Sequence, residues 1–179
     1  SFVLMIFGAV VIGVLEWNNP RTLGSLDSLS KILDSIFASV MPRTAGFNSL
    51  DISAMNPATW LVINFLMFIG GASASTAGGI KVGTFVVLLY VVYTEIRGET
   101  AVNIGNRRLP RSMQRQALTI VALTASVIVA SVILLRLTTT FSLDQILFEV
   151  MSAVGTVGLS TGITPNLPDH AKFLLSLLM

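Results

Sequence analysis

The sequence has no cysteine and only one histidine, His170. Without thiols the chain can form neither a disulfide nor a thiolate metal site. One imidazole is too few for a histidine-based metal centre, because such centres hold the metal with several ligands. We therefore expect no resident cofactor in this chain.

Charged residues are also scarce. They make up 11% of the chain, whereas a soluble domain carries about 25%. Hydrophobic residues reach 53%, and the mean hydropathy is +0.82. This composition indicates an integral membrane protein. The net charge of +2 is too small to suggest a nucleic-acid partner, and no catalytic triad or paired-carboxylate arrangement suggests an enzyme.

Both ends of the chain lie in apolar runs, Phe2 to Leu15 and Ala171 to Met179. The first run is shorter than the roughly 20 residues that a membrane-spanning helix needs. It has neither the basic segment nor the small-residue cleavage site of a signal peptide. We expect the chain to be a piece of a longer multi-pass protein.

Two glycine-containing segments are the main functional signal, Thr44-Ala45-Gly46-Phe47-Asn48 and Thr156-Val157-Gly158-Leu159-Ser160. Each follows a short apolar run and precedes a polar loop and another hydrophobic segment. This order is typical of a re-entrant pore loop, in which a short helix enters the membrane and an extended strand leads back out. Glycine suits such a strand because it adopts left-handed and extended φ/ψ, so that successive carbonyls can face a pore. Two copies in matching contexts are much stronger evidence than one.

The segments before the two loops are candidate pore helices. Leu23 to Val40 is amphipathic, with apolar residues three and four apart. Its second half is a candidate pore helix, and an interfacial surface helix is the alternative interpretation. Leu143 to Val154 is the second candidate, with Ser142 as its cap. Glu149 lies inside it, and a carboxylate buried at that depth needs a partner or water.

Acidic residues near the expected outer side could concentrate cations at a pore mouth, although solvated loop positions are their default interpretation. They are Glu16, Asp27, Asp34 and Asp51.

The segment from Trp60 to Glu95 is too long for one membrane helix. At about 1.5 Å per residue it would be roughly 54 Å long, against a hydrocarbon core of about 30 Å. The expected break is a run of small residues followed by Ile80 and Lys81: Gly70, Gly71, Ala72, Ser73, Ala74, Ser75, Thr76, Ala77, Gly78 and Gly79. Irregular backbone at membrane depth lines a cavity or is buried in protein, and close helix packing is the other explanation for the small residues. A phosphate-binding loop does not fit, because Lys81 does not follow glycine.

The chain divides into two similar units. Residues 1–96 and 116–179 each contain a helix, a pore loop and the start or whole of a second helix, and residues 97–115 join them. Five arginines lie in this linker, at 97, 107, 108, 111 and 115. The positive-inside rule places them in the cytoplasm, so that both pore loops open outward.

The motifs resemble the Trk/Ktr/HKT superfamily of potassium transporters. The resemblance rests on Arg43-Thr44-Ala45-Gly46-Phe47-Asn48, on the run from Gly70 to Lys81, and on Gly155 to Gly162, and it covers essentially the whole chain. The form of the first motif is closer to KtrB-like subunits than to TrkH-like ones. The resemblance implies an all-α integral membrane fold of the plasma membrane, with potassium-channel-like helix–pore-loop–helix repeats. Four such repeats form the family's pore, and this chain would hold the third and fourth.

The resemblance also implies site residues and partners. Potassium would be transported, with sodium considered as a coupling or activating ion, past backbone carbonyls of Thr44, Ala45, Gly46, Phe47, Thr156, Val157, Gly158 and Leu159. Residues Gly70 to Gly79, with Lys81, would form an intramembrane gate. A cytoplasmic RCK-type nucleotide-binding ring, a second copy of the protein, the two remaining repeats and membrane lipid would be the partners. The alternative is a secondary cation transporter with broken helices and its site at the glycine-rich loop.

Overall fold

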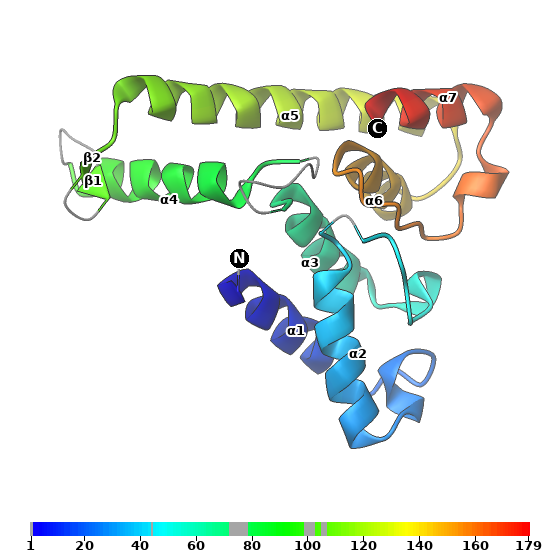
Figure 1. Cartoon of the computed structure of the whole chain (residues 1–179). Helices are drawn as coiled ribbons and strands as arrows, with labels where there is room; N and C mark the ends of the chain where they lie inside the picture. Colours follow the sequence, from blue (N-terminus) through cyan, green and yellow to red (C-terminus); the bar gives the residue numbers. More distant parts are fainter. Residues whose placement is uncertain (1, 44, 72–78, 99–102, 105–106) are drawn as a thin grey trace.

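The computed structural model of the chain is almost entirely helical (Figure 1), and it describes residues 2–43, 45–71, 79–98, 103–104 and 107–179. These residues form the α-helices α1 (Phe2–Glu16), α2 (Ser28–Val40), α3 (Pro57–Phe68), α4 (Val82–Ile96), α5 (Arg111–Thr138), α6 (Leu143–Val154) and α7 (Asp169–Leu178). Three 3-10 turns lie between helices: η1 (Leu23–Ser25), η2 (Ile52–Ala54) and η3 (Thr164–Asn166). In the described ranges the only extended pairing is the two-residue antiparallel ladder of β1 (Asn103–Ile104) and β2 (Arg107–Arg108). The expected helical fold class is confirmed.

Two helices begin at side-chain caps, and the sequence predicts the one at Ser142. At the start of α6, the Ser142 hydroxyl accepts a hydrogen bond from the Gln145 N–H, and the Gln145 side chain accepts one from the Ser142 N–H, which completes a capping box. At the start of α3, the Asn56 side chain accepts from the Ala58 N–H at 3.1 Å, and Pro57 occupies the first turn.

Two helices begin at other residues than the sequence pattern suggests. The amphipathic stretch from Leu23 to Val40 is not one helix, because Asp27 adopts extended φ/ψ and separates η1 from α2. Helix α5 begins at Arg111, inside the predicted linker of residues 97–115. Pro110 precedes it with φ −59°, a geometry that suits a helix start. The apolar pattern starts only further along, so it missed this solvated first turn.

The predicted break in the Trp60–Glu95 segment is confirmed. Helix α3 ends at Phe68, and α4 begins at Val82. Figure 1 shows that α4 then runs beside α5 and away from α1 and α2. The interruption therefore redirects the chain as well as shortening the helices.

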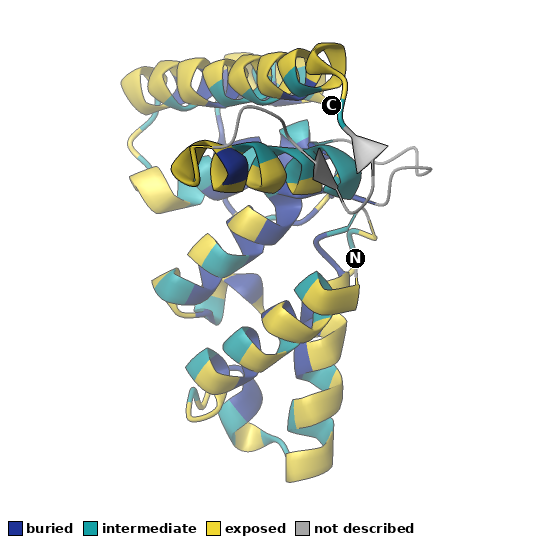
Figure 2. Cartoon of the chain, turned by 90° about the vertical axis from the view of Figure 1, so that its left-hand side faces the viewer, coloured by how far each residue is buried: buried dark blue, intermediate teal, exposed yellow. Residues whose placement is uncertain are grey.

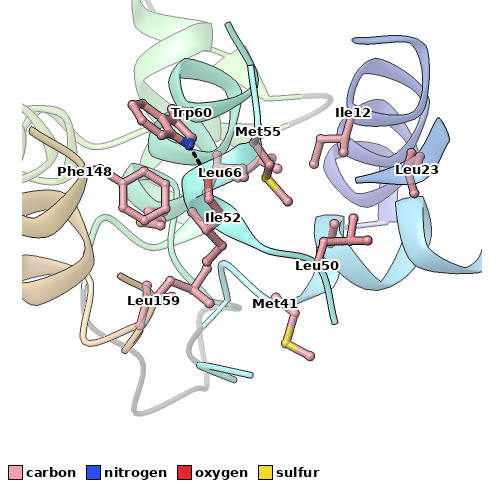
Figure 3. Packing of buried hydrophobic residues seen from close by; sticks show 14 residues of the cluster. Ile12, Leu23, Met41, Leu50, Ile52, Met55, Trp60, Leu66, Phe148 and Leu159 are labelled. Carbon is pink, nitrogen blue, oxygen red and sulfur yellow. Dashed lines mark hydrogen bonds between the residues drawn. The ribbon is translucent and has the colours of Figure 1, made fainter. Parts of the chain in front are cut away.

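The helices pack around two apolar clusters. In the first, α1 packs on α2 and α3, and α3 carries the contact onward to α6. Trp60 of α3 lies against Phe148 of α6, with ring centroids 6.4 Å apart, and its indole N–H donates to the Ile52 carbonyl at 2.8 Å (Figure 3). The second cluster joins α5, α6 and α7. Helix α6, the candidate pore helix, thus belongs to both clusters and links the two halves of the chain.

Helix α1 approaches α2 closely at Gly8. A Cβ atom on Gly8 would lie 2.4 Å from the Ser39 hydroxyl oxygen and 2.8 Å from a methyl carbon of Leu66. The Ser39 hydroxyl donates to the Met5 carbonyl at 2.7 Å. Small and hydroxyl-bearing residues at such contacts are typical of helix packing in membranes.

Among the described residues, α5 is the one helix long and apolar enough to cross a membrane by itself, and α1, α3 and α4 are shorter apolar helices. Figure 2 shows that most residues of α5 are exposed. Its exposed side chains are largely apolar, among them Leu118, Leu123, Val129 and Ile133. A helix with such a surface is suited to contact with lipid or with further apolar helices.

Candidate pore loops and gate

The two predicted filter glycines lie next to each other. Gly46 has φ +69° and Gly158 has φ +87°, conformations that favour glycine. A Cβ on Gly158 would lie 3.6 Å from the Cα of Gly46, and a Cβ on Gly46 would lie 2.6 Å from the Val157 carbonyl oxygen. The fold therefore brings together two backbone segments that are far apart in the sequence, and both use the freedom of glycine where they meet.

The second loop folds tightly back on the end of α6. The Thr156 N–H donates to the Ala153 carbonyl at 3.0 Å, and the Val157 N–H donates to the Ser152 carbonyl at 2.9 Å. Thr156 adopts φ +51°, which is uncommon for a β-branched residue. The side chains of Val157 and Leu159 are buried, whereas Gly158 is exposed. Such strained backbone is often found at functional sites.

The first loop is less enclosed in this chain. The Ala45 N–H donates to the Met41 carbonyl at 3.3 Å, and Ala45 is exposed. Phe47 is 73% exposed. Thr44, a predicted filter residue, lies outside the described residues. The corresponding side chains of the second loop are buried, so the two loops differ in packing although their glycines share a conformation.

Glu149 has the partners that a buried carboxylate needs. It lies on α6 and is 5% exposed. Its Oε1 accepts from the Ser160 hydroxyl at 2.8 Å, from the Thr161 N–H at 2.9 Å and from the Thr161 hydroxyl at 3.0 Å. Its Oε2 accepts from the Thr164 hydroxyl at 2.8 Å. The carboxylate thus bonds the segment that follows the second loop to α6.

The predicted gate begins and ends against the last turn of α3. The Ile80 N–H donates to the Phe68 carbonyl at 3.1 Å, and the Val82 N–H donates to the Gly71 carbonyl at 3.3 Å. Gly79 has φ +74°. Gly70 and Gly71 are buried, and Lys81 is exposed at the cap of α4. The other predicted gate residues lie outside the described residues: Ala72, Ser73, Ala74, Ser75, Thr76, Ala77 and Gly78.

One carbonyl lies close to both the predicted gate and the start of the second loop. A Cβ on Gly79 would lie 3.1 Å from the Met67 carbonyl oxygen, and a Cβ on Gly155 would lie 3.5 Å from the same oxygen. Gly155 caps α6 and directly precedes Thr156. Met67 itself is fully buried. The end of α3 is therefore packed between the predicted gate and the predicted filter.

Glu16 is not a solvated acid at a pore mouth, and that default interpretation was wrong. It is fully buried at the end of α1. One oxygen accepts from the Asn19 amide at 2.7 Å and from the Thr22 hydroxyl at 2.6 Å. The other accepts from the Asn56 N–H at 2.8 Å and from the Thr59 hydroxyl. The burial of Glu16 depends on Thr22 and Thr59, which meet it only in the folded chain. The one feature of the sequence that could have indicated this burial is an acidic residue at the end of an apolar run.

The remaining outer acids differ from Glu16. Asp27 and Asp51 are exposed and Asp34 is half-buried. Within the described residues no group of three histidine or acidic side chains could hold a metal ion. The backbone loops, rather than side-chain ligands, are the chemically distinctive feature.

The comparisons with known proteins agree on one family. The sequence matches the family TrkH, "Cation transport protein", over residues 1–179. It is 38% identical to "Ktr system potassium uptake protein B" of Bacillus subtilis over 179 residues, which is 100% of this chain and 40% of that protein. It is 36% identical to the protein of the same name from Vibrio alginolyticus over 176 residues, 98% of this chain and 39% of that protein. Another relative is "Potassium/sodium uptake protein NtpJ" of Enterococcus hirae, 35% identical over 180 residues, 98% of this chain and 40% of that protein.

The fold has a solved counterpart. The crystal structure of the potassium transporter TrkH from Vibrio parahaemolyticus matches with a TM-score of 0.80 at 22% identity, over 99% of this chain and 40% of that one. At this identity the match shows a shared fold. The chain spans about 40% of the length of these relatives.

Proposed function

Since this chain belongs to the TrkH family of cation transport proteins, which are integral membrane transporters and not enzymes, we propose that it forms part of a potassium-translocating subunit. The relatives are named as potassium or potassium/sodium uptake proteins. The observation that carries the proposal is the contact between Gly46 and Gly158, two left-handed glycines on two re-entrant loops. In this proposal the chain holds the third and fourth repeats, as residues 1–96 and 116–179.

The two loops supply part of a carbonyl filter. Backbone carbonyls of residues 44–47 and 156–159 would replace the hydration shell of a potassium ion, so that no charged side chain is needed. Each loop has a single clear filter glycine, against two in the TVGYG filter of potassium channels. A filter of this kind holds a shorter ordered segment and fewer ion sites. We therefore expect weaker discrimination of potassium from sodium than in a potassium channel.

A difference in burial between the two proposed pore helices supports the need for further repeats. When Thr44 is aligned with Thr156, Phe148 of α6 falls on Ile36 of α2. Phe148 is fully buried against Trp60 of α3, whereas Ile36 is 42% exposed. Ile36 lines an apolar groove of about 520 Å³ between α1 and α2. A helix equivalent to α3, from another repeat, would cover this groove as α3 covers α6.

The interruption between α3 and α4 is proposed as the gate. It lies beside the Met67 carbonyl, which also contacts the residue before the second filter loop. A cytoplasmic RCK-type nucleotide-binding ring would act on this gate, and the complete protein would form a homodimer. Sodium is proposed as a coupling or activating ion. The alternative, a secondary transporter with its cation site at the interruption, also fits the broken helix.

Uptake of potassium, rubidium and sodium by the complete protein tests the proposal. The wild type is compared with Gly46→Ser and Gly158→Ser, with Gly98→Ser as a control at an exposed left-handed glycine that has no neighbour within 4 Å. We expect either loop substitution to weaken the apparent affinity for potassium or to admit sodium, and Gly98→Ser to do neither. Unchanged uptake and selectivity in both loop variants would overturn the filter. The broken-helix transporter would then be the better interpretation.

A further inference from the structure

The segments that leave the two filter loops are held by different means. After the second loop, Ser160, Thr161 and Thr164 all donate to the buried carboxylate of Glu149. In the alignment of Thr44 with Thr156, the position of Glu149 falls on Phe37, which is 40% exposed. The helix before the first loop therefore has no carboxylate at the position equivalent to Glu149.

The hydrogen bonds of Glu149 reach close to the filter backbone. Ser160 and Thr161 follow Gly158 and Leu159 directly, and the Ser160 hydroxyl also accepts from the Gly162 N–H at 2.9 Å. Gly162 has φ +87°, so the chain turns sharply there. The carboxylate therefore fixes both the exit of the filter strand and the turn that follows it.

We propose that Glu149 is a positioning residue for ion selectivity: by holding residues 160–164 against α6, it sets the conformation of the carbonyls of Val157 and Gly158. This inference rests on the proposed function. Hydrogen bonds to a carboxylate are among the stronger ones in proteins, and four of them meet on this one side chain. A filter strand held in this way keeps its carbonyls at a fixed spacing, which favours one ion size over another.

Two substitutions of Glu149 separate position from charge. Glu149→Gln keeps the shape and one acceptor oxygen, and its amide can donate to the Thr164 hydroxyl, which can also accept. Glu149→Met keeps the volume and removes every acceptor for the donors of residues 160–164. Asp144→Asn is the matched control, because Asp144 is an exposed acid on the same helix outside this network.

The measurement is the ratio of the apparent KM values for sodium and rubidium in uptake by the complete protein. We expect Glu149→Met to lower the discrimination by about tenfold, which corresponds to about 1.4 kcal/mol, and Glu149→Gln to stay within about threefold of wild type. Asp144→Asn should leave the ratio unchanged. If Gln and Met raise both KM values equally and leave the ratio alone, the charge acts only by attracting cations, and the positioning role is overturned.

A second variant covers the case in which Glu149→Met fails to reach the membrane. Thr164→Val removes one donor to Glu149 with little change in shape, and Thr140→Val makes the same chemical change at an exposed position before α6. We expect only Thr164→Val to lower the discrimination. If neither Thr164→Val nor Glu149→Met changes the discrimination while Gly158→Ser does, this inference is overturned and the proposed filter stands. No change in any of them would overturn both.

Discussion

The Cα of Gly46 lies 3.6 Å from the point where a side chain on Gly158 would begin. A side chain would nevertheless have less space at Gly46 than at Gly158. A Cβ on Gly46 would lie 2.6 Å from the Val157 carbonyl oxygen, inside van der Waals contact, whereas a Cβ on Gly158 meets only ordinary contact distances. The two glycines are thus required for partly different reasons.

We predict that Gly46→Ala is more damaging than Gly158→Ala. Both substitutions place a side chain at positive φ, a strain of about 1–3 kcal/mol. Only Gly46→Ala adds a clash with a carbonyl of the other loop. Thermal unfolding of the detergent-solubilised protein and rubidium uptake should both rank wild type above Gly158→Ala and Gly158→Ala above Gly46→Ala. Equal losses in the two variants would contradict the close approach of the loops.

Glu16 should be essential to the fold rather than to ion affinity. Its carboxylate accepts four hydrogen bonds from the loop after α1 and the start of α3. Glu16→Met leaves the buried hydroxyls of Thr22 and Thr59 without this acceptor, at about 1–3 kcal/mol for each unsatisfied group. We expect a clearly lower melting temperature for Glu16→Met, a smaller loss for Glu16→Gln, and none for Glu95→Gln, whose acid is exposed.

The apparent KM for potassium provides the contrasting measurement for Glu16. This KM should stay near the wild-type value in the fraction of the Glu16→Gln protein that folds. A raised KM with unchanged stability would mean that Glu16 faces the ion path instead.

Gly79 and Gly98 form a matched pair for the gate. Both have left-handed φ, +74° and +68°. A Cβ on Gly79 would lie 3.1 Å from the Met67 carbonyl oxygen, whereas a Cβ on Gly98 would have nothing within 4 Å. The difference between Gly79→Ala and Gly98→Ala therefore isolates the contact with the end of α3. We expect Gly79→Ala to change the maximal rate of uptake by about threefold or more, because 0.6–0.7 kcal/mol suffices for that factor, and Gly98→Ala to leave the rate unchanged. Equal rates of uptake in the two variants would mean that the contact of Gly79 with the end of α3 has no role in gating.

Local signals in the sequence were sufficient for the helix caps, the helix break and the conformation of the loop glycines. Ser142 carries its capping chemistry in its own side chain, and the break follows from the length of an apolar segment against the membrane thickness. The positive φ of Gly46 and Gly158 follows from the residue type at a strand that must bend. Each of these features depends on neighbours within a few positions.

Contacts between segments far apart in the sequence could not be predicted from such local signals. The burial of Glu16 depends on Thr22 and Thr59, which meet it only after α1 and α3 have packed. The need of Glu149 for a partner was evident from its place in a predicted pore helix, but Ser160, Thr161 and Thr164 could be identified only from the return path of the chain. The first turn of α5 was missed because Arg111 to Arg115 is polar and solvated, so hydrophobic periodicity does not mark it.

The interruption between α3 and α4 leaves and rejoins the scaffold at nearly the same place, because the Ile80 N–H bonds to the Phe68 carbonyl. The placement of α3 and α4 is consequently independent of how many residues lie between these two anchors. Doubling the length of such a loop costs only about 0.6 kcal/mol of closure entropy. Evolution can therefore lengthen, shorten or rewrite this segment, which is the proposed gate, without rebuilding α3 and α4.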